Sequence, residues 1–396
     1  MLKYCVGIDV SKDSFHCCIS VIDQQQRVTV KGSRKFVNNR TGFIELDHWI
    51  SKNHKNKEVP LVVAMEATGI YYENVAMYLF KQRYSVSVVL ANKAKKYLQS
   101  TGLKSKNDKI DAQGLSRMGA EQSLALWEPL GEYFYVLREL TRQHQSLQEM
   151  KTRYSNQLEA AESGMYQVKL IAKQLKSSIK MVENQIGDLE AVIKSYIEGN
   201  KEVADKVEGI CRVKGLGLHT VDVIAAETNG FALFNNSRQL ASYAGYDIVE
   251  NQSGNHRGKT RISKKGNSRI RRALHMPAFN MIRYEQAPFI GLFNRTMERH
   301  GRKMKSYVAV QKKLLVIIYS LWKNNVAYDP KYIHKHTGEK ELVPSSQSDG
   351  LAQADVLNEN SASSKAALHK VDILSNDRSL PPLSNHKNKA KIVWNL

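Results

Sequence analysis

Two carboxylates stand inside apolar, β-type runs in the first third of the chain. Asp9 lies in the motif Gly-Ile-Asp-Val-Ser-Lys, and Glu66 lies in Met-Glu-Ala-Thr-Gly. A charge in an apolar run is too costly to keep unless it holds a cation, so these two residues predict a divalent-metal site. A third acidic motif, Asp-Lys-Ile-Asp, supplies Asp108 and Asp111.

The charge balance indicates what such a site would act on. The chain has 59 Lys and Arg against 38 Asp and Glu, a formal net charge of +21. This excess is typical of polyanion binders and predicts nucleic acid as the partner. The length of 396 residues and the hydrophobic content of 42% suggest two or three domains with real cores.

The cysteines and the apolar runs bear on the compartment. Cys5, Cys17, Cys18 and Cys211 form neither a C-x-x-C pair nor a zinc-finger spacing, which favours a reduced, intracellular protein. The chain starts directly with a strand pattern, and its longest late apolar run, 314–322, is too short to span a bilayer. We therefore expect a soluble, cytoplasmic protein.

The first third alternates strand and helix patterns. Strands are predicted over 4–22 (broken by a polar turn at 11–14), 27–37, 60–67 and 85–90, with helices over 42–51 and 72–83. This order implies an α/β sheet that opens with an antiparallel meander. Asp9 then falls on the first strand, Glu66 at the end of a later one, and Asp108 and Asp111 at the start of a helix reaching about residue 121. Carboxylates gathered at strand ends are the geometry of an RNase-H-like nuclease core.

The middle of the chain carries apolar heptads. They run over 135–158 and again over 171–193, and predict two long helices that form a hairpin. Heptads with charged flanks need no ligand to explain them, so this arm is predicted to be structural or a dimerisation device. After about residue 328 the composition turns to Ser, Asn, Lys and Asp, and the tail is predicted to be disordered.

Residues 209–227 suggest two short helices joined by a turn with Gly215 and Gly217. This pattern is typical of a helix-hairpin-helix, in which glycines let backbone N–H groups approach a phosphate. An ordinary tight turn explains it equally well.

A basic segment follows at 251–272, and no acidic residue occurs between Asn251 and Tyr284. Phosphate contact explains it better than a merely solvated face, because Gly-bounded turns and an amphipathic helix order the charges. Ser253-Gly254 lies within it. Taken alone, such a pair marks an ordinary loop far more often than a nucleophile. The cations are Arg257, Lys259, Arg261, Lys264, Lys265, Arg269, Arg271 and Arg272.

In their order, the three acidic motifs, the glycine hairpin and the motif Ser-Gly-Asn-His-Arg-Gly-Lys-Thr-Arg resemble the DEDD transposases of bacterial insertion sequences. These are bridge-RNA-guided recombinases with pilin-gene DNA invertases as relatives, and the resemblance covers residues 4 to about 327. It implies an α/β plus α architecture. The domains would be a RuvC-like, RNase-H-like metal domain (1–130), a coiled-coil arm (131–205), a mainly helical serine domain with the helix-hairpin-helix (206–330), and a tail (331–396).

The resemblance also implies site residues and partners. Asp9, Glu66, Asp108 and Asp111 would hold Mg²⁺ or Mn²⁺, and Ser253 would attack a DNA phosphate in a site shared between protomers. Donor and target DNA, a guide RNA and a homo-oligomer, dimeric or tetrameric on DNA, are the expected partners. The implied location is the cytoplasm of a bacterium, in association with the nucleoid. Elementary chemistry agrees, because serine is a weak nucleophile that needs an activating base or metal. Asp111 also fits a plain helix-dipole role.

Two other functions remain open at this stage. A RuvC-type junction nuclease would hydrolyse DNA with water and would need no serine. A non-catalytic architectural protein would use charge, arm and hairpin alone.

Overall fold

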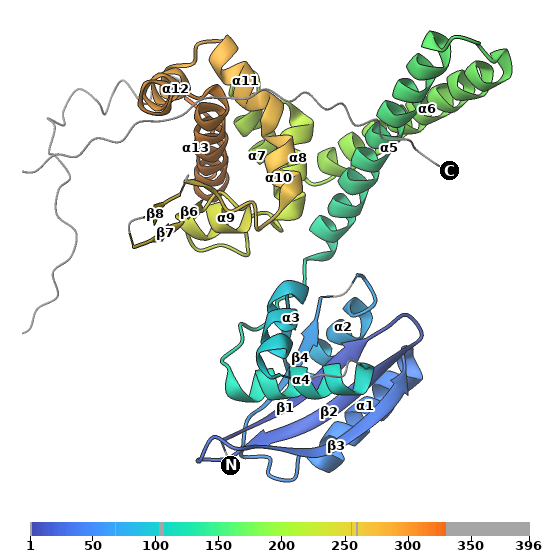
Figure 1. The fold of residues 1–396 in the computed structure, drawn as a ribbon, viewed down its shortest axis with the longest axis vertical. Coiled ribbons are helices and arrows are strands. Elements are labelled where there is room, and N and C mark those ends of the chain that lie inside the picture. Colours follow the sequence, from blue (N-terminus) through green and yellow to red (C-terminus); the bar gives the residue numbers. More distant parts are fainter. Residues whose placement is uncertain (1, 68, 103–106, 255, 259, 330–396) are drawn as a thin grey trace, which may run out of the picture. The chain divides into compact units, whose positions relative to one another are not determined.

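The computed structural model describes residues 2–329, apart from 68, 103–106, 255 and 259, so the predicted tail lies outside the described residues. Its N-terminal part is a mixed α/β layer built on a five-stranded sheet of order β3-β2-β1-β4-β5 (Figure 1). β1, β2 and β3 form the predicted antiparallel meander, and β4 and β5 continue the sheet parallel to β1. The strands are β1 (Lys3–Val10), β2 (Ser14–Ile22), β3 (Val28–Val37), β4 (Leu61–Glu66) and β5 (Ser85–Val89).

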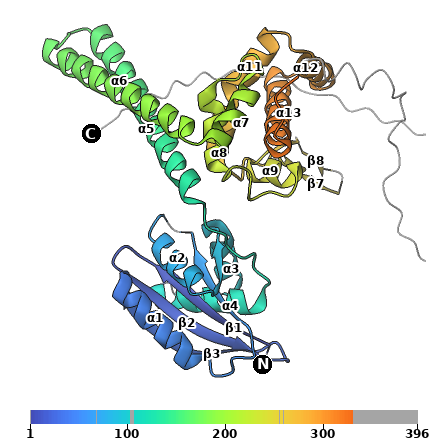
Figure 2. The ribbon, with the colours of Figure 1, turned by 180° about the vertical axis from the view of Figure 1, so that it is seen from behind.

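Helices cover both faces of this sheet, with α1 and α4 on opposite sides in both views (Figures 1 and 2). Strand alternation explains the division. Val6 and Ile8 pack in one core with Leu46 of α1 and Leu79 of α2, whereas Cys5 packs on the other side with α4. The helices are α1 (Arg40–Asn53), α2 (Glu73–Lys81), α3 (Ala91–Ser100) and α4 (Asp108–Glu121).

Helix α4 lies directly on the backbone of β1, because Gly7 has no side chain. A Cβ atom at Gly7 would lie 2.1 Å from the backbone nitrogen of Ser116 and 2.2 Å from the carbonyl oxygen of Ala112. Further along, a Cβ at Gly119 would lie 2.3 Å from Sγ of Cys5. The helix therefore runs back along the strand, and its first turn points toward the end of β1 that carries Asp9.

Gly7→Ala is expected to destabilise the N-terminal part by about 3 kcal/mol, because the obstructing atoms are backbone and cannot rotate away. Urea unfolding followed by circular dichroism measures the effect. Gly187→Ala is the matched control: it lies within helix α6, where an added Cβ meets nothing within 4 Å, and should be neutral or slightly stabilising. An unchanged unfolding midpoint for Gly7→Ala would contradict this packing.

The remainder of the described chain is mainly helical. Two long helices, α5 (Glu132–Ser163) and α6 (Lys169–Glu198), form the predicted hairpin, hereafter the arm, in which Leu147, Val182 and Ile186 interlock. At its base, Leu137 and Ile193 belong to the core of the following helices. Those helices are α7 (Lys201–Cys211), α8 (Leu218–Glu227), α9 (Ser237–Tyr243), α10 (Ser268–Ala273), α11 (His275–Arg283), α12 (Ala287–His300) and α13 (Lys303–Asn324). The coiled-coil geometry and the exact domain boundaries stay predictions.

Between α9 and α10 the chain forms two small antiparallel ladders. β6 (Ile248–Val249) pairs with β9 (Arg261–Ile262), and β7 (Gln252–Ser253) pairs with β8 (His256–Arg257). We call residues 248–262 the serine segment. The predicted turns of this region are therefore organised into a hairpin within a hairpin.

Candidate functional site

Asp9 and Glu66 lie at the C-terminal ends of two neighbouring parallel strands, where Asp9 is the residue before the last of β1 and Glu66 is the last of β4. Ile8 of β1 pairs with Met65 of β4, and the two carboxylates are the next residue on each strand. Adjacent strands lie about 4.8 Å apart, so the two side chains start from neighbouring positions. Each is half-buried.

Both carboxylates also share the face of the sheet that α4 covers. Asp9 is two residues from Gly7, and Glu66 is two residues from Ala64, whose Cβ lies 3.1 Å from the position of a Cβ built on Gly119 of α4. Since residues two apart on a strand share a face, Asp9 and Glu66 point to the α4 side.

The first turn of α4 brings the other two predicted carboxylates to this side. Asn107 caps the helix by accepting a 2.9 Å hydrogen bond from the backbone N–H of Ile110, and Asp108 and Asp111 form the first turn. Their charges also complement the helix dipole. The side chain of Asp108 is 63% exposed and Asp111 is half-buried. All four predicted carboxylates therefore lie on the same face of the sheet.

His16 belongs to the same group, although sequence reasoning did not select it. It is the β2 partner of Asp9, so their side chains lie on one face, and its Nδ1 lies 3.6 Å from Oδ2 of Asp108. Ser20, four residues further along β2, lies on the same face and reaches Ser116 of α4, with 2.6 Å between the two hydroxyl oxygens.

The donor set suits a hard divalent cation, since Mg²⁺ prefers oxygen ligands. Among the described residues, no three His, Cys, Asp or Glu side chains converge closely enough to hold an ion by themselves. Magnesium commonly binds through one or two carboxylates, with water and substrate phosphates completing its shell. Asp9 and Glu66, side by side at the strand ends, fit that mode.

Ser253 lies at the tip of the serine segment. It pairs with His256 across the β7–β8 ladder, with two residues between them. Gly254 has φ +53°, a left-handed conformation that such a tight turn requires, and a Cβ there would meet nothing within 4 Å. Both Ser253 and His256 are exposed. In the sequence, the pairing of His256 with Ser253 is indicated by the spacing Ser-x-x-His alone.

The six predicted phosphate-binding cations whose side chains the structure describes fall into two groups of three. Three of them are exposed and take part in none of the ion pairs found among the described residues: Arg261, Lys264 and Lys265. Lys259 and the side chain of Arg257 lie outside the described residues.

The other three cations contact the protein itself. The Nε of Arg269 lies 3.9 Å from a carboxylate oxygen of Glu227, and Arg272 forms an ion pair with Glu149 of the arm. Arg271 donates to two backbone carbonyl oxygens at 2.8 and 3.3 Å. These contacts support structural roles for the three arginines in the free protein.

The two hairpin glycines also differ. Gly215 has φ +91°, and a Cβ there would lie 2.9 Å from Cβ of Asn280 and 3.1 Å from the ring of Tyr284, so α11 and the residue after it cover this position. Gly217 is the N-cap residue of α8, and nothing lies within 4 Å of its Cβ position. Only Gly217 of the pair has the open backbone that a phosphate contact needs.

Two family models match this chain, one over the part with the carboxylates and one over the part with Ser253. A transposase family model matches residues 6–166, and a model described as "Transposase IS116/IS110/IS902 family" matches 207–291. The pilin gene-inverting proteins of Moraxella lacunata and Moraxella bovis are 30% identical over 337 residues, covering 85% of this chain and 100% of each relative. This chain belongs to the IS110-type transposase family.

Other matches to this transposase are shorter. A putative transposase, y4rJ, of Sinorhizobium fredii is 35% identical over 116 residues, 28% of either chain. The Thermus thermophilus RuvC structure is 10% identical with a TM-score of 0.25, covering 31% of this chain and 99% of that one. The same protein with a Holliday junction substrate gives a TM-score of 0.23, with 11% identity and 30% and 93% coverage. At these TM-scores the structural likeness carries no argument.

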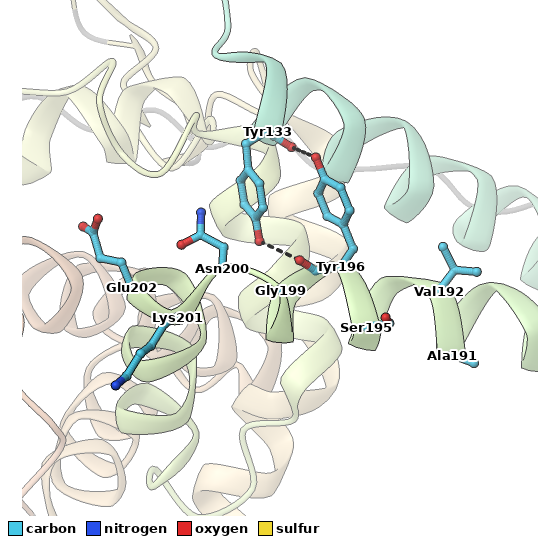
Figure 3. A pocket seen from close by; sticks show the side chains of 9 residues that line it. All are labelled: Tyr133, Ala191, Val192, Ser195, Tyr196, Gly199, Asn200, Lys201 and Glu202. Carbon is cyan, nitrogen blue, oxygen red and sulfur yellow. Dashed lines mark hydrogen bonds between the residues drawn. The ribbon is translucent and has the colours of Figure 1, made fainter.

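A surface hollow of about 990 Å³ lies elsewhere in the transposase, where α5 begins and α6 turns into α7 (Figure 3). Tyr133 and Tyr196 stack on its wall at 4.8 Å between ring centroids. None of the predicted site residues lines it, so we assign it no part in the chemistry. No helix within the described ranges is long and apolar enough to cross a membrane.

Proposed function

We propose that this transposase cuts and rejoins DNA, with Ser253 as the nucleophile and Asp9, Glu66, Asp108 and Asp111 as the metal-binding carboxylates. The observation that carries the proposal is the pair Asp9 and Glu66, which lie next to each other near the C-terminal ends of adjacent parallel strands, on the face that α4 covers. The match to the pilin gene-inverting proteins, which spans the whole length of those relatives, supports DNA as the substrate.

The carboxylate group would form the metal half of a RuvC-like core. Asp9 and Glu66 would bind the ion directly, while Asp108 and Asp111 approach from α4 and His16 restrains Asp108. When bound, Mg²⁺ or Mn²⁺ supplies Lewis-acid chemistry and offsets the negative charge of a phosphate during transfer.

The serine half would perform the bond exchange. The Oγ of Ser253 attacks a DNA phosphorus, an Oγ–P bond forms, and the P–O bond to the sugar breaks. The serine proton leaves, and the released sugar oxygen takes up a proton. Attack by a hydroxyl of the other DNA end then restores the serine. The number of phosphodiester bonds is conserved, so no nucleoside triphosphate is needed.

The two halves need a partner arrangement and nucleic-acid contacts. We propose a homo-oligomer in which the carboxylates of one protomer act with Ser253 of another, and we propose that Arg261, Lys264 and Lys265 bind phosphates. Their exposure supports this role. Guidance by a structured RNA is supported by the motif resemblance alone, and full-rate recombination by a nuclease-treated, RNA-free preparation would contradict it.

Removal of the metal tests the proposed function. Wild-type protein with its element's RNA is mixed with labelled donor and target DNA, and products are separated by denaturing electrophoresis. With Mg²⁺ or Mn²⁺ we expect recombinants and a covalent protein–DNA adduct. EDTA should reduce both at least about 1,000-fold, since metal stabilisation of phosphoryl transfer is worth several kcal/mol.

The other outcomes separate the alternatives. Nicked DNA that requires metal but never carries protein would indicate a junction nuclease that uses water. DNA binding without any cleavage, with or without metal, would indicate an architectural protein. Recombination at an undiminished rate in EDTA would remove the metal from the mechanism.

A further inference from the structure

A buried carboxylate connects the arm to the region that carries Ser253. Glu227 is the last residue of α8, and its side chain is 1% exposed. Arg142 of α5 donates a hydrogen bond to each of its oxygens, from Nε at 2.7 Å and from Nη2 at 2.9 Å. The Nδ2 of Asn267 donates to the same carboxylate, at 2.7 Å from Oε2. Three separate parts of the chain therefore meet at this one side chain.

The carboxylate remains ionised in this environment. Burial alone would raise the pKa of Glu227, but the hydrogen bonds and charge of Arg142, with Asn267 and Arg269, outweigh burial and hold the pKa below its ordinary value. The two parallel hydrogen bonds from one guanidinium also fix the relative orientation of the two groups, which a single lysine cannot do.

Asn267 is part of the structure that closes the base of the serine segment. We call residues 243–247 and 263–267 the neck. Backbone hydrogen bonds join its two sides: the N–H of Ser263 donates to Asp247 at 2.7 Å, that of Lys264 to Gly245 at 3.1 Å, and that of Asn267 to Tyr243 at 2.7 Å. The serine segment leaves and re-enters the domain through this neck, so the neck determines its direction.

Asn267 divides its amide between two tasks. Its Oδ1 caps α10 by accepting from the N–H groups of Arg269 and Ile270 at 2.9 and 3.2 Å, and only its Nδ2 reaches Glu227. Capping α10 therefore does not require Glu227. The contact between Nδ2 and the carboxylate serves to join the neck to α8 and, through Arg142, to the arm.

We propose that Glu227 is a positioning residue, which couples the neck to the base of the arm and so orients Ser253 for attack. This inference rests on the proposed nucleophilic role of Ser253. A buried ion pair adds little net stability over well-packed apolar residues, so its value here is geometric, and an arm engaged by a second protomer would act on the serine through it.

Two variants test the coupling from its two sides. Asn267→Ser keeps a capping oxygen for α10 but removes the donor to Glu227. Arg142→Lys keeps the charge but loses the paired hydrogen bonds. Lys151→Met is the matched control, because it breaks an arm ion pair with Glu183, at 2.8 Å, that does not reach the neck.

The variants are compared by amide hydrogen exchange and by the rate of covalent adduct formation at saturating DNA. In Asn267→Ser we expect the neck amides to exchange about 10-fold faster, with β1 and β2 amides unchanged. Adduct formation should slow about 10- to 100-fold in both variants while the DNA Kd stays within about two-fold, since small misplacement of a reacting group costs this much. Lys151→Met should match wild type in all readouts.

Two results overturn the coupling. One is a loosened neck with an unchanged rate of adduct formation, and the other is a neck that exchanges as in wild type in Asn267→Ser. If DNA affinity falls in parallel with the rate of adduct formation, Glu227 only stabilises the domain in general, and the proposed coupling is overturned. If wild-type protein forms no serine adduct at all, the proposed function itself fails. That result is distinct, because it is seen without any of the variants.

Discussion

Ser253→Ala is expected to abolish the covalent protein–DNA adduct and recombination, while DNA affinity stays within about two-fold of wild type. Gln252, Ser253 and Gly254 are exposed, and a Cβ at Gly254 would meet nothing within 4 Å, so loss of one hydroxyl should not disturb folding. Removing a nucleophile that no other group replaces costs at least about 10,000-fold in related chemistry. Trapping on labelled donor DNA, followed by denaturing electrophoresis, measures both adduct and free nicks.

Gln252→Ala is the control for this experiment. Gln252 precedes Ser253 on β7 and is also exposed, but it lies on the other face of the hairpin. It should form adduct at close to the wild-type rate. An adduct that persists in Ser253→Ala would place the nucleophile elsewhere. Equal nicking without adduct in wild type and Ser253→Ala would mean that Ser253 is an ordinary loop residue.

The elements that hold Asp9 and Glu66 were predictable from the sequence because the signal is local. Alternating and continuous apolar runs place strands at β1 and β4, and Asn107 followed by Asp108 marks a helix start. Helix α3 was not predicted, because its apolar stripe is short. Only Ala94 is fully buried, Tyr97 and Leu98 are half-buried, and the other residues of the helix are exposed, so the periodic signal covers little more than one turn.

The contacts between distant residues could not be predicted. His16 meets Asp108 only because Gly7 lets α4 lie on β1, and nothing near position 16 in the sequence encodes that approach. The basic segment shows the same limit. Positive charge predicts phosphate binding for Arg269 and Arg272 alike, but the carboxylates beside them, Glu227 and Glu149, come from helices far away in the chain.

Asp9→Asn is expected to lower the rate of adduct formation at least about 1,000-fold in Mg²⁺ without unfolding the protein. Asparagine has the size of aspartate but a neutral oxygen, so the strand packing is kept while an anionic ligand beside Glu66 is lost. The rate is measured across a Mg²⁺ titration. A second readout needs no DNA: Mg²⁺ should raise the Tm of the wild type but not of Asp9→Asn, because a ligand stabilises only a fold that binds it.

Asp13→Asn is the matched control for this variant. Asp13 is an exposed carboxylate four residues further on, and the backbone N–H of Asn38 donates to its backbone carbonyl rather than to its side chain. It should retain the wild-type rate and the wild-type response to Mg²⁺. Because an architectural protein would ignore the loss of one carboxylate at a strand end, a wild-type rate in Asp9→Asn would contradict both the metal site and the recombinase built on it.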